Sequence, residues 1–247
     1  MRLPHALDRR PWAPPLLAAL GVTLVVTALS WLLPARFAST GVGFAFLLAT
    51  YALVLRHDDE VVRRHGLSLG GLFERDAKLD AGRLARSLAL ACGVALLVAV
   101  VIFPPFVVGY PVYWGKIVGR ALFYQGHPVA LPPRFLEEVL GQVFVIALPE
   151  EAFFRGYLQT KLEAAWPRGL RVLGATVGPA LLVTSVVFAL GHVATQPQLP
   201  RLAVFFPSLL FGVLRGATGG VGAAVAFHAM CNLLTGLLAL NFGLAKG

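Results

Sequence analysis

Two adjacent glutamates and an arginine lie in one of the most apolar stretches of this chain. The segment 149–155 reads Pro-Glu-Glu-Ala-Phe-Phe-Arg, and the run 142–148 before it has the character of a membrane-helix interior. An ionisable side chain at that depth costs at least a few kcal/mol, even on mild insertion scales. We therefore interpret Glu150, Glu151 and Arg155 as functional groups. The alternative is that they mark the solvated end of a membrane helix.

Helical spacing separates the roles of the two glutamates. Residues four apart share a face of a helix, so Glu151 and Arg155 are expected to pair and to neutralise each other in a low dielectric. Glu150 points about 100° away from Glu151, because a helix has 3.6 residues per turn. Glu150 is left without that cationic partner, and a glutamate in such a setting suits the role of a general base.

Two histidines and an asparagine lie in later apolar runs. His192 ends the run 186–192, and His228 and Asn232 are four residues apart within the run 226–232, so these two share one helix face. A single membrane histidine is more often a packing residue than a catalytic one. Two polar side chains aimed at one point, however, can donate hydrogen bonds to a developing oxyanion. With a glutamate base they make up the components of a hydrolytic site.

The elements that must position these groups are membrane helices. Apolar segments close to the ~20 residues that cross a bilayer recur along the chain. They cover about 15–33, 41–56, 86–108, 135–157, 174–193, 200–215 and 219–243. The sequence thus predicts an all-α, polytopic membrane helix bundle of about seven transmembrane helices, with six to eight possible, in a single domain over 1–247. The proline-broken aromatic segment 109–133 is expected to be interfacial or re-entrant.

The composition supports membrane integration and argues against other classes. Of the 247 residues 57% are hydrophobic and 13% are charged, whereas soluble domains carry about 25% charged residues. The net charge of +9 does not indicate nucleic-acid binding, because the basic residues lie in short loops, where they set topology and meet lipid headgroups. Cys92 and Cys231 both lie in apolar stretches and indicate neither a disulfide framework nor a metal cluster.

Basic residues also set the expected orientation and location. Arg2, Arg9 and Arg10 precede the first apolar run, which is long enough to span and is expected to stay uncleaved. The loop 57–85 is the most basic loop, so we expect it and the N-terminus to be cytoplasmic. Composition and the absence of an organelle-targeting signal suggest a bacterial inner membrane. The side to which the site opens is left undecided by these patterns.

Three motifs in order carry a family resemblance. They are Glu-Glu-x-x-x-Arg at 150–155, Phe-x-x-x-His at 188–192 and His-x-x-x-Asn at 228–232. The ordered set resembles the CPBP family of intramembrane proteases, which includes CAAX-processing endopeptidases and bacterial Abi-type proteins. The resemblance covers about 135–243, and the N-terminal spans over about 15–108 carry no family signal.

The resemblance implies an intramembrane endopeptidase that cuts near the membrane end of a protein or peptide, at a membrane-proximal or C-terminal tail. Glu150 would activate water as general base, and His192 would hold that water or share the proton. His228 and Asn232 would stabilise the oxyanion. Glu151 and Arg155 would pair and orient the site.

Several alternatives stay open. Two glutamates and two histidines could bind zinc, but the sequence lacks His-Glu-x-x-His and asparagine is a poor zinc ligand, so we expect no metal cofactor. A non-enzymatic immunity or scaffold protein of the same family is the second possibility. A proton-coupled transporter that uses Glu150 and His228 is the third, although the paired broken helices of such carriers are not visible.

Overall fold

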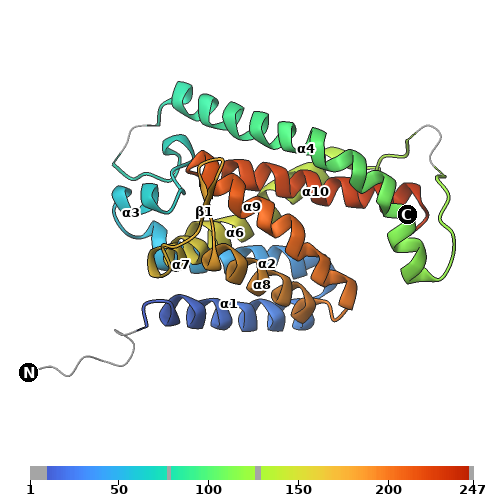
Figure 1. The fold of residues 1–247 in the computed structure, drawn as a ribbon, viewed down its shortest axis with the longest axis horizontal. Helices are drawn as coiled ribbons and strands as arrows, with labels where there is room; N and C mark the ends of the chain where they lie inside the picture. The colour runs from blue at the N-terminus through green and yellow to red at the C-terminus, as the bar shows by residue number, and fades with distance from the viewer. Residues whose placement is uncertain (1–9, 77–78, 126–128, 245–247) are drawn as a thin grey trace, which may run out of the picture.

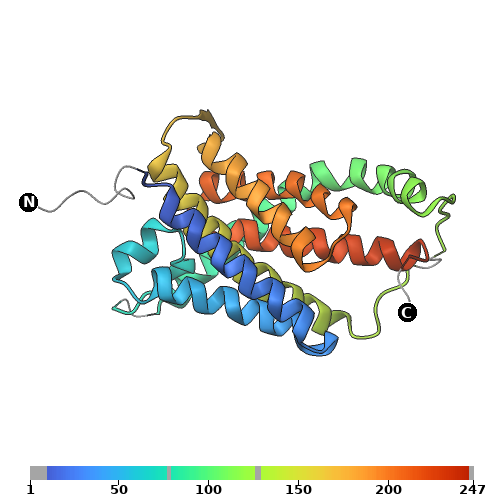
Figure 2. The same cartoon turned by 90° about the horizontal axis from the view of Figure 1, so that it is seen from below.

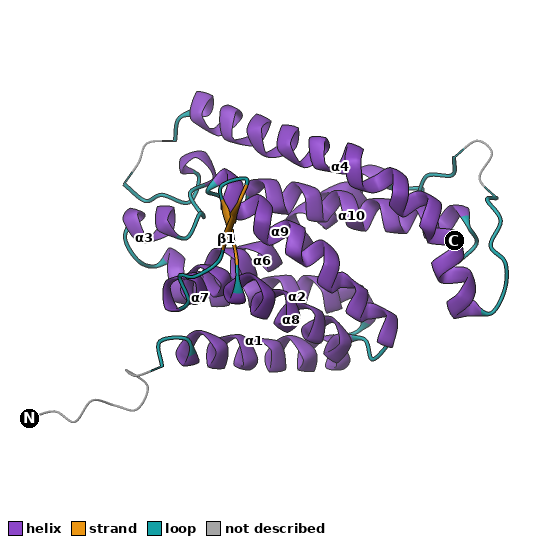
Figure 3. Cartoon of the chain, viewed as in Figure 1, coloured by secondary structure: helices purple, strands orange, loops and turns teal. Residues whose placement is uncertain are grey.

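The computed structural model describes residues 10–76, 79–125 and 129–244 as a bundle of helices with one short β-hairpin (Figures 1 and 3). The first half contains α1 (Ala13–Leu32), α2 (Ala35–Thr50), η1 (Tyr51–Leu55), α3 (Asp59–Arg64), η2 (Leu69–Gly71) and α4 (Ala81–Val118). A continuous helical run follows, made of α5 (Phe135–Leu140), η3 (Gly141–Ala147), α6 (Leu148–Glu151), η4 (Ala152–Gln159) and α7 (Thr160–Ala165). The rest comprises β1 (Leu170–Val172), β2 (Ala175–Val177), α8 (Pro179–Thr195), η5 (Leu199–Val204), α9 (Phe205–Thr218) and α10 (Gly222–Asn241).

The predicted helical membrane bundle is confirmed. Five helical segments are long and apolar enough to cross a membrane: 13–32, 35–55, 81–118, 199–218 and 222–241. The shorter apolar helix α8 and the continuous helical run 135–165 occupy the two other segments expected from hydropathy. Each overlaps one of the seven segments expected from hydropathy.

The long helix α4 corrects one prediction. The segment around Tyr110 was expected to leave the helix, but α4 continues through Pro104, Pro105 and Pro111 to Val118. Each proline removes a helix hydrogen bond, yet such residues are tolerated in membrane helices when packing compensates. Tyr110 is buried and its ring lies 5.8 Å from that of Phe242 beyond α10, so tertiary contacts hold this part of α4 in place.

The continuous run 135–165 carries the first motif at its centre. Wide π-type turns at 141–147 and 152–159 flank α6, and such turns are frequent at functional sites. Helix α2 lies so close to this run that a side-chain carbon at Gly43 would collide with the carbonyl oxygen of Val145. Glycine at position 43 therefore allows α2 to lie directly against the turn that precedes Glu150.

The bundle has two distinct ends, which lie at opposite ends of its long axis in Figures 1 and 2. The segments 56–76, 79–80, 166–178 and 219–221 lie at one end together with the start of α1, and we call it the basic end. The segments 33–34, 119–125, 129–134 and 196–198 lie at the other end with the end of α10, and we call it the opposite end. The two-stranded hairpin, in which Leu170 pairs with Val177, belongs to the basic end.

Candidate active site

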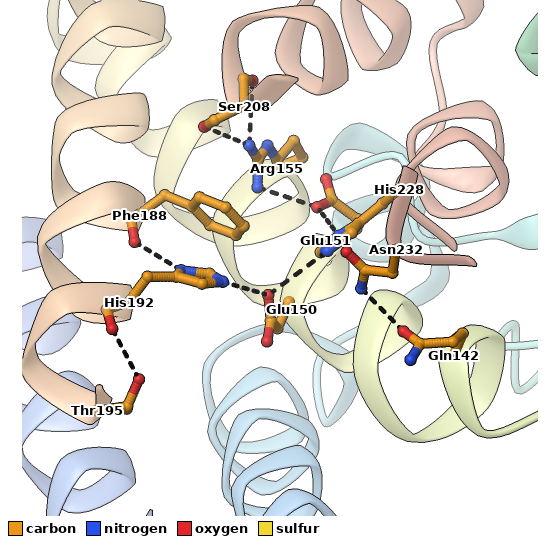
Figure 4. A network of polar contacts seen from close by, with 10 residues as sticks. All are labelled: Gln142, Glu150, Glu151, Arg155, Phe188, His192, Thr195, Ser208, His228 and Asn232. Carbon is orange, nitrogen blue, oxygen red and sulfur yellow. Dashed lines mark hydrogen bonds and ion pairs between the residues drawn. The ribbon is translucent and has the colours of Figure 1, made fainter. Parts of the chain in front are cut away.

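Three separate helices bring Glu150, His192 and His228 together. The Nε2 atom of His192 lies 3.9 Å from Glu150 Oε2, and the Nε2 atom of His228 lies 4.0 Å from the same oxygen (Figure 4). Glu150 comes from α6, His192 from the last turn of α8 and His228 from the first half of α10. Glu150 Oε2 is buried and has no hydrogen-bond partner within the described part of the chain.

The predicted end of the fourth apolar segment was wrong. The fourth apolar segment was expected to end near residue 157, whereas its helix continues to Ala165. Glu150 therefore lies fifteen residues from either end of the run 135–165. This central position allows it to meet His192 on the neighbouring α8.

Glu151 and Arg155 form the buried ion pair that their spacing predicts. Arg155 Nη1 donates to Glu151 Oε1 at 3.0 Å, and both side chains are fully buried. Arg155 Nη2 also donates to the carbonyl and the hydroxyl oxygen of Ser208 on α9, at 3.0 and 2.6 Å. The guanidinium lies 4.5 Å from the ring centre of Phe188. Arg155 thus joins α9 and α8 to the helix that carries both glutamates.

Both histidines are held through Nδ1, which leaves Nε2 facing Glu150. His192 Nδ1 lies 2.9 Å from the carbonyl oxygen of Phe188. His228 Nδ1 lies 2.8 Å from Glu151 Oε1. A carbonyl and a carboxylate accept hydrogen bonds, so the Nδ1 atoms carry the protons. In their neutral forms both rings therefore present an Nε2 lone pair toward Glu150.

Asn232 belongs to the site through a different partner. Its Nδ2 donates to Gln142 Oε1 at 2.9 Å, and Gln142 Nε2 donates to Glu138 Oε1 at 2.8 Å. Asn232 has a second amide hydrogen that this bond does not use. Gln142 and Ser208 were not predicted as site residues. A glutamine at the start of the apolar run 142–148 is the one signal that could have indicated Gln142.

A cavity of about 1310 Å³ leads from these groups toward the opposite end of the bundle. Its lining includes Glu150, His192, His228 and Asn232, so all four predicted catalytic residues face the same space. The remaining lining is mainly apolar and comes from several helices, among them α1, α2, α4, η3, α8, η5, α9 and α10.

The donor types of a zinc site are present, but their spacing differs from one. Zinc binds nitrogen and oxygen ligands at about 2.0–2.2 Å, so two tetrahedral ligand atoms lie roughly 3.4 Å apart. The distances of 3.9 and 4.0 Å from Glu150 Oε2 are wider. Among the described residues, no group of three or more His, Cys, Asp or Glu side chains could hold a metal ion. In this arrangement the two imidazoles lie farther from Glu150 Oε2 than two ligands of one tetrahedral zinc lie from each other.

Residues 132–234 match the family model described as type II CAAX prenyl endopeptidase Rce1-like. The matched segment contains all three motifs and runs from just before α5 into α10. No curated protein and no solved structure matches the chain.

Proposed function

We propose that this integral membrane protein, whose residues 132–234 match the Rce1-like family model, is an intramembrane endopeptidase. It would hydrolyse a peptide bond near the membrane end of a protein or peptide substrate, at a membrane-proximal or C-terminal tail. The observation that carries the proposal is the convergence of His192 and His228 on Glu150 from three helices, inside an apolar cavity.

The spacing of Glu150 and His192 suits one water molecule. The 3.9 Å between Glu150 Oε2 and His192 Nε2 is too long for a direct hydrogen bond, and a water between the two atoms would bridge them. Glu150 takes a proton from this water while its oxygen attacks the carbonyl carbon of the substrate. His192 accepts a hydrogen bond from the water and fixes its position. Glu150 then passes the proton to the leaving nitrogen as the carbon–nitrogen bond breaks.

The oxyanion requires donors on the other side of the carbonyl. Because Nδ1 of His228 donates to Glu151, His228 can donate through Nε2 only as an imidazolium. Asn232 offers its second amide hydrogen. Removal of one oxyanion donor typically costs a factor of about 10²–10³ in kcat, which gives the scale for His228 and Asn232.

Charge counts support a cytoplasmic N-terminus and a cavity that opens away from the cytoplasm. Eleven described basic residues lie near the basic end: Arg10, Arg56, Arg63, Arg64, Arg75, Arg83, Arg86, Lys161, Arg168, Arg171 and Arg215. Five lie near the opposite end: Arg36, Lys116, Arg120, Arg134 and Arg201. Cytoplasmic loops carry the excess of basic residues. In a bacterial inner membrane, substrates would then reach the cavity from the outer face.

Labelling of introduced cysteines tests this orientation. A membrane-impermeant thiol reagent is expected to label Ser39→Cys in intact cells and Arg75→Cys only after lysis. Ser39 lies at the start of α2 and lines the cavity, whereas Arg75 lies in the basic loop. The reverse pattern would place the cavity on the cytoplasmic side.

Proteolysis by the purified protein in detergent or liposomes tests the activity. Lipidated peptides and transmembrane-tail peptides serve as substrates, and Glu150→Gln is expected to abolish cleavage at normal expression. The matched control is Glu137→Gln, which makes the same change at an exposed residue of the same helical run. Full activity of Glu150→Gln would refute the mechanism. Failure of the wild type on every peptide would favour the non-enzymatic alternative.

A further inference from the structure

A phenyl ring lies against each of the two histidines of the site. The ring centre of His192 is 4.4 Å from that of Phe188, whose carbonyl oxygen also accepts from His192 Nδ1. The ring centre of His228 is 4.7 Å from that of Phe211 on α9, and the two ring planes are 15° apart, so these rings are stacked. Phe188 belongs to the second motif, whereas Phe211 lies outside all three motifs. The stacked partner of His228 is therefore a residue of the site that the motifs do not include.

The contact with Glu151 alone does not fix the ring of His228. The torsion that turns a histidine ring has broad minima, so the ring can pivot about the line from its Nδ1 to Glu151 Oε1. A stacked phenyl ring removes this freedom, because a turn of the imidazole out of its plane would press its edge into the face of Phe211. Phe211 thus sets the plane of the imidazole, and Glu151 sets its direction within that plane. Together they hold Nε2 at 4.0 Å from Glu150 Oε2.

Phe211 is itself held in place by its surroundings. It is 2% exposed, and its ring centre lies 5.1 Å from the guanidinium carbon of Arg155. The edge contact with Phe188, at 6.3 Å between the ring centres, fixes another side of the ring. Three residues earlier on the same helix, Ser208 accepts from Arg155. Helix α9 therefore supports the site at two points, at Arg155 through Ser208 and at His228 through Phe211.

We propose that Phe211 is a positioning residue of this site and acts on the reaction through His228. Its ring keeps the imidazole turned so that Nε2 faces the place where the oxyanion forms. The inference rests on the proposed endopeptidase function for its meaning in catalysis, whereas the orientation of His228 stands on the ring contact alone. A leucine at position 211 would remain apolar but would have no flat face, so the imidazole would turn among several orientations.

Nuclear magnetic resonance in detergent tests the ring contact without requiring cleavage. Protein with ¹³C-labelled histidine gives ring C–H signals for its six histidines, and the signals that disappear in His228→Gln identify His228. A phenyl ring shifts the resonances of protons stacked on its face, so the His228 signals are expected to move in Phe211→Leu. In Phe211→Tyr, which keeps the ring, they are expected to stay close to the wild type. Unchanged His228 signals in Phe211→Leu overturn the proposal.

Steady-state cleavage of a peptide that the wild type cuts tests the role in catalysis. Phe211→Leu is expected to lower kcat about ten- to a hundredfold with little change in KM, since a misplacement of about 1 Å can cost a hundredfold in rate. Phe211→Tyr is expected to recover most of the lost rate, because it keeps the aromatic face. A loss of kcat at constant KM is the pattern of an interaction that acts in the transition state.

The matched control is Phe242→Leu. Phe242 is a buried phenylalanine directly after α10, the helix of His228, and it lies outside the described cavity lining. Its ring contacts those of Tyr110 and Tyr124, each at 5.8 Å between the ring centres. This variant is expected to lower the unfolding temperature, as Phe211→Leu does, but to keep the wild-type kcat and the wild-type His228 signals.

The outcomes separate this inference from the proposed function. A rise in KM at unchanged kcat would identify Phe211, which lines the cavity, as a substrate contact and overturn the proposal. Equal losses of kcat in Phe211→Leu and Phe242→Leu would overturn it too, because the effect would then be general destabilisation. His228 signals that move while the wild type cleaves no peptide would contradict the protease and leave Phe211 as the residue that orients His228. Cleavage by the wild type with an unchanged kcat in Phe211→Leu would contradict the positioning role and leave the protease standing.

Discussion

His228 Nδ1 lies 2.8 Å from Glu151 Oε1, so the second glutamate of the Glu-Glu pair holds a histidine from a helix 77 residues further along the chain. The same oxygen accepts from Arg155 Nη1. Glu151 therefore does more than neutralise an arginine: it fixes the ring of His228 so that Nε2 faces Glu150. The two adjacent glutamates have different surroundings: Glu151 Oε1 accepts from Arg155 and contacts His228 Nδ1, whereas Glu150 Oε2 faces the Nε2 atoms of His192 and His228.

Arg155→Ala is expected to destabilise the protein strongly. The substitution leaves the fully buried Glu151 carboxylate without its cation and also removes both contacts to Ser208. Removing one partner of a buried ion pair typically lowers the free energy of unfolding by about 3–5 kcal/mol, because the other charge stays buried without a partner. Thermal unfolding of the purified protein in detergent, together with its level in the membrane, measures the effect.

The control for this prediction is Arg64→Ala. Arg64 and Glu60 form an ion pair with the same four-residue spacing at 2.7 Å, but both side chains are exposed. Exposed pairs contribute about 0.2–1 kcal/mol, so this variant is expected to unfold close to the wild type. Equal destabilisation by the two substitutions would contradict the structural role assigned to Arg155.

Gln142→Leu is expected to lower kcat by about ten- to a hundredfold with little change in KM. Gln142 accepts from Asn232, and without it the Asn232 amide is free to rotate away from the oxyanion position. A misplacement of about 1 Å can cost a hundredfold in rate. The readout is the split between kcat and KM on a cleaved peptide.

Glu138→Ala serves as the matched substitution, because it removes the outer hydrogen bond of the same series and leaves the bond between Gln142 and Asn232 intact. We expect it to retain most of the activity. A rise in KM alone in Gln142→Leu would instead mean that Gln142 contacts substrate and does not position Asn232.

The sequence predicted contacts that follow from local geometry. The pairing of Glu151 with Arg155 depends on four-residue spacing within one helix, and the helix itself follows from hydropathy. Seven helical segments and their order were predicted in the same way. The four proposed catalytic side chains were predicted from ordered motifs, and they do line one cavity.

The contacts that escaped prediction join residues far apart in the chain. Ser208 lies 53 residues from Arg155, and Gln142 lies 90 residues from Asn232. No helical period connects such pairs, because their contact depends on how α9 and α10 pack on the run 135–165. The full length of α4 was not predicted for a related reason. Its prolines indicate a break in the helix, but the packing of Tyr110 holds the helix together there.

Acid is expected to destabilise the protein through His65, which lies outside the membrane-spanning segments. Burial lowers the pKa of His65 below its ordinary value, and the nearby cations Lys161, Arg215 and Arg64 lower it further. Its Nδ1 lies 2.8 Å from the carbonyl of Val61. The unfolded chain therefore binds the proton more readily than the folded protein. The contribution of neutral His65 to the free energy of unfolding is fully present above the pKa of His65 in the unfolded chain, about 6.5. This contribution is lost as the pH falls through the lower pKa of His65 in the folded protein.

His65→Gln is expected to flatten this acid dependence. Urea or thermal unfolding in detergent, followed between pH 7.5 and 5, gives the slope for the wild type and the variant. His57→Gln is the control, because His57 lies in the same connection but is exposed. A wild-type stability that rises on acidification, or an unchanged slope in His65→Gln, would contradict the assignment.

A strong chelator is expected to leave cleavage unchanged. In the proposed mechanism Glu150 takes the proton from water directly, and its distances of 3.9 and 4.0 Å to the two imidazoles exceed the roughly 3.4 Å between tetrahedral zinc ligands. A zinc protease treated in parallel confirms that the chelator works. Elemental analysis of the purified protein is expected to find far less than one zinc per chain. If chelation stops cleavage and zinc restores it while magnesium does not, the metal-dependent alternative holds. His192 and His228 would then be ligands, and each would keep its Nδ1 partner as the outer contact that orients a metal-binding imidazole.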